Sequence, residues 1–248
     1  MGSTLPVDAE SEASPANPKD SLRLFLGGNL GLTFANGIQL VLFAWIVANV
    51  LGASAERVGL AQAAMMVPGL ALLLVGGLTA DRFDALRLLP PLHVIALLPI
   101  AVVAYQLHNG TLSYGTMIGY ALAMGALAAF VAPARDALLS RVGYGEIQRT
   151  VTLQLAASYL GQLGAFALTA LEVIPPLGAL AIQGASLLAA AASFRAIRPP
   201  RPHAGQLAGG SGLREIADAL RVTLASTRLR STLAVQLSIG LLLAGSWM

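Results

Sequence analysis

An aspartate–arginine pair, Asp81 and Arg82, ends a long apolar segment and is the part of the chain best suited to charge-based chemistry. A carboxylate there can meet the positive end of a neighbouring helix or an arginine from an adjacent polar break, and Arg135 and Arg149 are available. Gly77, one helical turn earlier, would let a second helix approach closely. The alternative is a solvated ion pair, which contributes about 0–1 kcal/mol.

Polar side chains follow one face of two apolar segments, where they could line a cavity for a small, partly apolar compound. Asn29, Thr33 and Asn36 recur at helical spacing in the first segment. Further candidates for the same cavity are Gln39, slightly off that stripe, Gln62 in the next segment, and Gln154, Ser158 and Gln162 in a later one. The alternative is hydrogen bonding between helices, which contributes about 0.6 kcal/mol on average.

Other kinds of chemistry find little support in the residue pattern. The chain has no cysteine, and its three histidines fall in different segments, so we expect neither a disulfide nor a metal site. No H-E-x-x-H or G-x-S-x-G motif is present, so we expect no enzyme and no cofactor. The net charge of +3 comes from scattered arginines rather than a basic face, which argues against nucleic acid.

The apolar residues are grouped in long blocks that would position these side chains. Mean hydropathy is +0.73 and only 11% of the residues are charged, against about 25% in soluble domains. A membrane-spanning helix needs about 20 mostly apolar residues. The blocks therefore predict seven spans, at about 22–48, 58–80, 88–107, 112–133, 150–171, 174–196 and 229–248. The third is the weakest, because Pro90, Pro91 and Pro99 interrupt it. A soluble helical core is disfavoured, because its helices would need a polar face.

Basic residues predict the orientation of these spans. With the N-terminus inside, 14 of the 15 Lys and Arg residues fall in breaks on one side, as is typical of cytoplasmic loops, and only Arg57 falls outside. The expected parts are a disordered cytoplasmic tail (1–21), a six-span bundle (22–197), a cytoplasmic linker (198–228) and a seventh span (229–248). Within the linker, residues 213–225 have the spacing of a short amphipathic helix, with a merely solvated linker as the alternative.

Two motifs, in register with this topology, resemble the major facilitator superfamily of transporters. Residues 77–87 resemble the loop after the family's second helix, which reads roughly G-x-x-x-D-R-x-x-x-x-R, and the matching residues are Gly77, Asp81, Arg82 and Arg87. Residues 132–139, read APARDALL, resemble the end of the fourth span in the drug and siderophore exporter branch, and residues 147–151, read IQRTV, fit its entry into the fifth span. These stretches contain Pro133, Arg135, Asp136 and Arg149.

The chain also departs from the family pattern in the first of these loops. Asp84 stands where the family usually has a second glycine, although the exporter branch often has Asp there. Ala85 and Leu86 occupy positions that are commonly basic, so only Arg87 remains of the basic cluster. A gate built on this loop would therefore be weaker than in typical relatives.

The resemblance implies an all-α membrane protein: the six-helix N-terminal bundle plus a seventh span, truncated relative to the usual twelve. It implies a secondary transporter of the plasma (inner) membrane, with the lipid bilayer and a small-molecule substrate as partners, that exports a small, partly apolar compound by alternating access. It implies that the charged motifs gate the transporter and that spans one, two, four and five face its cavity. A proton is the coupling ion of that branch, although no acidic residue lies at mid-membrane in the predicted spans. The alternative is a non-transporting membrane subunit or regulator that pairs with another chain.

Overall fold

Helices make up all the regular structure in the part of the chain that the structure describes. The structure is a computed structural model, and it describes residues 18–143, 147–170 and 174–198. In chain order the elements are α1 (Pro18–Trp45), the π-helix η1 (Ile46–Val50), α2 (Ala55–Arg82), α3 (Ala85–Ile95), α4 (Leu97–His108), α5 (Tyr114–Val142), α6 (Ile147–Ala170) and α7 (Pro176–Ala196). The predicted disordered tail (1–21) is wrong at its end, because residues 18–21 already belong to α1. The tail up to residue 17, the linker beyond Arg198 and the seventh span lie outside the described residues.

The six predicted spans that the structure describes each correspond to helix. α1 continues directly into η1, and α3 and α4 together form the third span. Five segments among the described residues are long and apolar enough to cross a membrane: 19–50, 85–108, 114–142, 147–170 and 176–196. The remaining helix, α2, has 28 residues and carries no charged side chain between Val58 and Ala80. This all-helical arrangement is consistent with a multi-pass membrane protein.

Short polar residues begin several of these helices by accepting hydrogen bonds from the first turn. Ser54 accepts from the amide of Arg57 at the start of α2, and Ser113 accepts from the amide of Thr116 at the start of α5. Asp84 does the same for Leu86 at the start of α3. Such caps satisfy amides that have no partner within the helix. The two-residue connection Phe83–Asp84 can therefore turn the chain sharply between α2 and α3.

The third span is broken at Ala96, between α3 and α4. Pro99 explains the position of the break, because it has no N–H to donate to the carbonyl of Ile95, four residues earlier. α3 itself continues through Pro90 and Pro91. The structure therefore has one break in this span and places it beside the last of the three prolines, while the whole segment 85–108 is long and apolar enough to cross a membrane.

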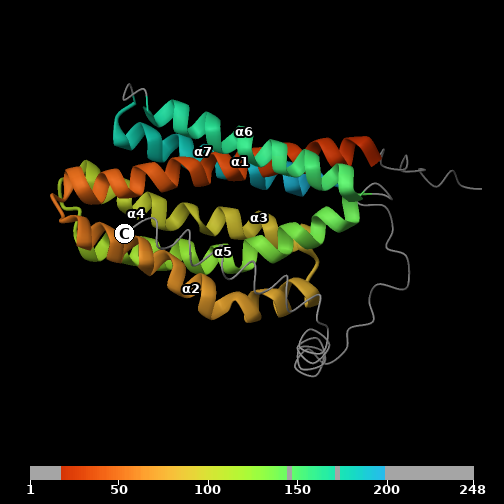
Figure 1. Ribbon diagram of the computed structural model, residues 1–248, viewed down its shortest axis with the longest axis horizontal. Helices are drawn as coiled ribbons and strands as arrows, with labels where there is room; N and C mark the ends of the chain where they lie inside the picture. The colour runs from red at the N-terminus through yellow and green to blue at the C-terminus, as the bar shows by residue number, and fades with distance from the viewer. Residues whose placement is uncertain (1–17, 144–146, 171–173, 199–248) are drawn as a thin grey trace, which may run out of the picture. The chain divides into compact units, whose positions relative to one another are not determined.

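The contacts between spans form a repeating pattern, in which replacing every span by the span three places later along the chain gives the same set of contacts. α2 packs on α5 and α1 on α6, which pairs spans 2 and 4 as well as spans 1 and 5. α1 also packs on α7, and α3 and α4 pack on both α5 and α7, so that spans 1–6, 3–4 and 3–6 are in contact. If three is added to each span number, counting on from six to one, the contact between spans 2 and 4 becomes the contact between spans 5 and 1. In the same way the contact between spans 1 and 6 becomes that between spans 4 and 3, and the contact between spans 3 and 6 becomes itself. Figure 1 shows α3 and α4 between the group of α1, α6 and α7 and the pair of α2 and α5.

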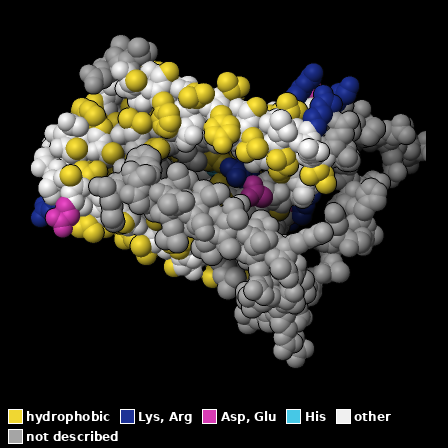
Figure 2. All heavy atoms as spheres, viewed as in Figure 1, with side chains coloured by type: hydrophobic (Ala, Val, Ile, Leu, Met, Phe, Trp, Pro, Cys, Tyr) yellow, Lys and Arg dark blue, Asp and Glu magenta, His cyan; other side chains and the backbone are white. Residues whose placement is uncertain are grey.

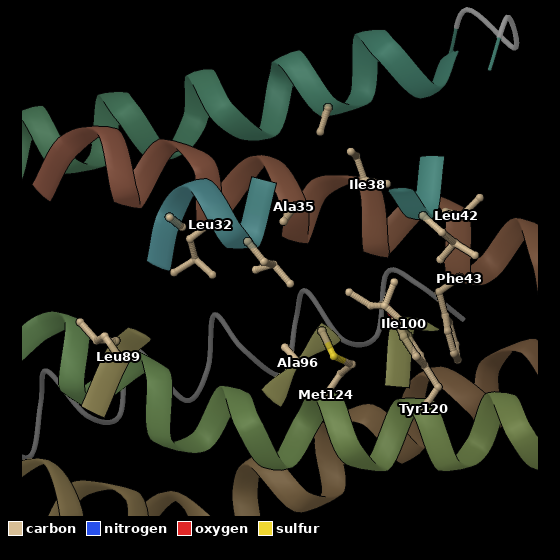
Figure 3. Close-up of a cluster of buried hydrophobic side chains, with 14 of the residues drawn as sticks. Leu32, Ala35, Ile38, Leu42, Phe43, Leu89, Ala96, Ile100, Tyr120 and Met124 are labelled. Atoms are coloured by element: carbon tan, nitrogen blue, oxygen red, sulfur yellow. The ribbon is translucent and has the colours of Figure 1, made fainter. Parts of the chain in front are cut away.

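Apolar side chains of α1, α3, α4 and α5 meet in the centre of the bundle. Figure 3 shows Leu32, Ile38 and Leu42 of α1 on one side of this core and Tyr120 and Met124 of α5 on the other. Small residues let some helices approach more closely still. A Cβ atom added at Gly76 would overlap the carbonyl of Ala129, so α2 and α5 touch through their backbones.

Charged side chains gather mainly at one end of the described bundle, the end at which α1 begins (Figure 2). Helix termini at this end contain Lys19, Arg23, Arg82, Arg87, Arg141, Arg149, Arg195 and Arg198. Arg57 lies near the start of α2, at the opposite end. Large apolar side chains are exposed between the ends, including Leu70 at 75% and Leu160 at 64%. An apolar belt between two polar ends is the surface that a bilayer requires.

Candidate functional site

The charged loop after α2 makes an ion pair with the end of α5. Arg141 Nη1 lies 2.7 Å from Asp84 Oδ1, and both side chains are partly exposed. Asp84 uses the same oxygen to cap α3. This pair ties the α2–α3 connection to the end of the fourth span. The side chain of Asp81 lies outside the described part, so its predicted contacts are not tested here.

The other basic residues of the two motifs lie at the same end of the bundle. Arg82 ends α2 and Arg87 begins α3, and both are exposed. Arg149 is exposed in the first turn of α6. Arg135 pairs with its neighbour Asp136, since its Nε and Nη2 donate to Asp136 Oδ1 at 3.2 and 3.1 Å. Arg141, which the sequence patterns did not single out, bonds to Asp84 of the loop.

Among the described residues, the close approach expected at Gly77 is found one residue earlier, at Gly76. A Cβ at Gly77 would meet nothing within 4 Å among the described residues, whereas at Gly76 it would overlap the Ala129 carbonyl. Pro133 explains why that carbonyl is available. It stands four residues after Ala129 inside α5 and has no N–H to donate to it. The proline of the APARDALL motif thus leaves a backbone oxygen facing Gly76 of α2.

Two of the predicted cavity residues on α6 instead join α6 to α1. Asn29 is fully buried, and its Nδ2 donates to Ser158 Oγ at 2.8 Å and to the carbonyl of Gln154 at 3.2 Å. Thr33 bonds to the carbonyl of Asn29 within its own helix. For the side chains of Asn29 and Ser158, the alternative of hydrogen bonding between helices therefore describes the contact, whereas Gln154 takes part through its main-chain carbonyl. Gln162, further along α6, is half-buried.

A second buried polar cluster joins α1, α2, α5 and α7. Gln183 Nε2 donates to Gln39 Oε1 at 3.2 Å and to the hydroxyl of Tyr120 at 3.0 Å. Gln39 Nε2 in turn donates to the sulfur of Met65 at 3.2 Å. Among the described residues, Gln183 Oε1 has no partner. Of this cluster only Gln39 was predicted as a site residue. The sequence could have indicated Gln183 as well, because it is the one amide side chain in the apolar helix α7.

A cavity of about 120 Å³ lies between α1, α3, α5 and α7. Its polar lining consists of Asn36, Gln39, His93 and Arg135. Asn36 is exposed at its mouth, whereas His93 and Gln39 are buried. Gln62, on α2, is half-buried and does not line this cavity. The structure thus brings two predicted cavity residues together with Arg135 and with a histidine that the sequence patterns gave no role.

The chain was compared with family models, with curated proteins and with solved structures, and nothing in any of the three matched it.

Proposed function

We propose that this chain is the N-terminal six-span half of a major facilitator-type secondary transporter that exports a small, partly apolar compound. In this proposal the bundle alternates between inward-open and outward-open states against a second bundle, which the rest of a longer protein or a second copy of the chain supplies. The cavity beside Asn36 and Gln39 receives the substrate, and the charged loop after α2 takes part in gating.

The observation that carries the proposal is the pattern of helix pairs. Contacts 2–4 and 5–1, and likewise 1–6 and 4–3, are related by a shift of three spans. Because three is an odd number, spans related in this way cross the membrane in opposite directions. Such a 3+3 inverted repeat within a six-span half is characteristic of major facilitator transporters. The pattern therefore supports the fold that the sequence motifs suggest, independently of those motifs.

The charge distribution supports a location in the plasma (inner) membrane with the N-terminus in the cytoplasm. Eight basic residues lie at the helix ends where α1 begins, and Arg57 lies at the opposite end. Cytoplasmic loops are enriched in Lys and Arg. The loop Phe83–Asp84 and the Asp84–Arg141 pair are then on the cytoplasmic side, where a gate would close the cavity from inside.

A substitution in the Asp84–Arg141 pair can distinguish an effect on gating, measured as the transport rate, from an effect on stability, measured as the melting temperature. Both side chains are more than a third exposed, and exposed ion pairs contribute about 0–1 kcal/mol. Asp84→Asn is therefore expected to leave the melting temperature close to that of the wild type. If the pair closes the cytoplasmic side, the same variant slows transport several-fold, and the exchanged pair Asp84→Arg with Arg141→Asp recovers part of the rate.

The test is an export assay in cells that lack their own drug exporters. The full chain is expressed, and accumulation of a panel of partly apolar compounds is followed over time; the panel includes the cationic dyes ethidium and a rhodamine, and radiolabelled benzoate. Lower accumulation of at least one compound than in cells with an empty vector is the expected result. A folded and inserted chain that exports none of them, and is instead recovered with a second membrane protein, would favour the non-transporting subunit.

A further inference from the structure

The cavity between α1, α3, α5 and α7 combines apolar walls with a few inward polar groups. Leu92, Leu127 and Val131 are among its apolar residues, and Arg135 and His93 are its ionisable ones. Its volume is about 120 Å³, below the roughly 150 Å³ of an enclosed cavity that takes a benzene molecule. The cavity is not enclosed, since Asn36 in its lining is exposed, so one end of a ligand can extend beyond it. Ala96, at the break between α3 and α4, also lines it. Interrupted helices of this kind form substrate sites in membrane transporters.

His93 presents a hydrogen-bonding atom without a partner. The side chain is only 2% exposed, and Nδ1 lies 2.6 Å from the carbonyl oxygen of Leu89. A carbonyl only accepts, so Nδ1 carries a proton in this bond. In the neutral ring Nε2 then presents a lone pair, and Nε2 has no partner among the described residues. Ionisable groups inside a membrane span are rare and usually functional.

Arg135 supplies a positive charge to the same cavity. Its side chain is 23% exposed, and its bonds to Asp136 use two of its three guanidinium nitrogens. Asp136 is itself 60% exposed, so the pair between them is weak. A guanidinium remains able to donate to a carboxylate, which is the acceptor that its geometry fits best.

We propose that this cavity binds the carboxylate of a small, partly apolar organic acid together with one proton. Arg135 donates to one carboxylate oxygen, and a proton held between His93 Nε2 and the other oxygen completes the site. The apolar part of the acid lies against Leu92, Leu127 and Val131. The inference rests on the proposed function, because it names the substrate class of the proposed transport cavity.

The proton has a definite origin and position. With the His93 ring neutral before binding and the acid ionised in solution, neither can donate to the other. Binding therefore takes up one proton from the solvent, which sits on the Nε2–oxygen line. The other ionisable side chains on α3 and on the helices that pack against it are Arg87, Tyr105, His108, Tyr114, Tyr120, Arg135, Asp136, Arg141 and Arg195. Of these, only Arg135 lines the cavity with His93.

Calorimetric titration of the purified full chain with benzoate tests the proposal, and benzamide serves as the uncharged probe of the same shape. Benzoate is expected to bind measurably more tightly than benzamide. Repeating the titration in buffers of different ionisation enthalpy should give an uptake of about one proton per benzoate. His93→Gln is expected to remove that proton uptake while retaining binding, because an amide N–H donates to a carboxylate without being protonated.

Two variants at α5 should change the affinity in opposite directions. Arg135→Gln is expected to weaken benzoate binding at least about 10-fold, as the loss of one charge-assisted hydrogen bond implies. Asp136→Asn removes the competing carboxylate and is expected to strengthen it. Arg195→Gln, an exposed arginine on α7 outside the cavity, is the matched control and should leave the affinity unchanged.

Equal binding of benzoate and benzamide would overturn the proposal, and so would unchanged affinity in a folded Arg135→Gln variant. If that variant does not fold, unchanged or weaker binding by Asp136→Asn overturns it instead. The outcome is separable from that of the proposed function. Benzoate binding without export of benzoate or of any other compound in the panel would reject transport and keep the site, whereas export of another compound without benzoate binding would reject only the site.

Discussion

Gly76 and Gly77 are chain neighbours with opposite surroundings, although both are glycines at the end of one apolar helix. Only Gly76 faces the backbone of α5, at the carbonyl that Pro133 leaves without its usual donor. An alanine substitution at Gly76 therefore tests the close packing of the two helices. The same substitution at Gly77 tests the residue that matches the sequence motif.

Gly76→Ala is expected to lower the free energy of unfolding by about 1–3 kcal/mol, because the new methyl group must push α2 away from α5. Gly77→Ala is the matched control. It meets open space among the described residues and should be neutral or raise stability by up to about 1 kcal/mol, since alanine favours helix. Thermal unfolding in detergent, followed by tryptophan fluorescence, measures both. Equal losses in the two variants would contradict the assigned contact.

The predicted polar residues illustrate what spacing can and cannot tell about a single side chain. The recurrence of Asn29, Thr33 and Asn36 places polar groups along one helix, as the structure has them. The spacing does not show that Asn29 bonds to α6 while Asn36 lines a cavity. This difference depends on which helix packs against each turn of α1. His93 and Arg141 were missed as site residues for the same reason.

At the scale of helices, proline chemistry decides how the third span is built. α3 and α4 are separated at Ala96, and the carbonyl of Ile95 lacks the amide that residue 99 would otherwise supply. Three prolines in the sequence predicted an interruption. Its position could not be predicted, because α5 also contains a proline, Pro133, and continues through it.

Pro99→Ala is expected to join α3 and α4 into one helix by giving Ile95 its missing donor. Amide hydrogen exchange in a peptide covering residues 92–103 should become slower than in the wild type, since a new backbone hydrogen bond closes there. Leu98→Ala, at an exposed neighbouring position, controls for the loss of a side chain. Unchanged exchange in Pro99→Ala would mean that packing rather than the missing donor causes the break.

At the scale of the whole molecule, composition and charge predicted the helical segments and their approximate bounds. They predicted much less about the contacts of single residues. Long apolar blocks predicted the helical segments because a bilayer selects for length and hydrophobicity alone. The described helices begin and end within a few residues of the expected spans, except that α5 continues to Val142 and so carries Arg135 into the helix. Which helices pack together was not predictable in this way, because every span presents similar apolar surface.

The orientation of the bundle is tested by labelling single cysteines, since the chain has no cysteine of its own. Thr111 and Gln148 are exposed near opposite ends of the bundle. With the basic end in the cytoplasm, Thr111→Cys should react with an impermeant maleimide in intact cells. Gln148→Cys should react only after permeabilisation. The reverse pattern would place the N-terminus outside.

The backbone contacts at the glycines also restrict how the bundle can deform. Where Gly76 meets the Ala129 carbonyl and Gly125 meets the Met65 carbonyl, no side chain separates the main chains of α2 and α5. One of these helices cannot slide along the other by shear without a main-chain collision, whereas sliding between packed side chains needs only rotamer changes. The pair α2–α5 is therefore expected to move as one stiff unit when the bundle deforms.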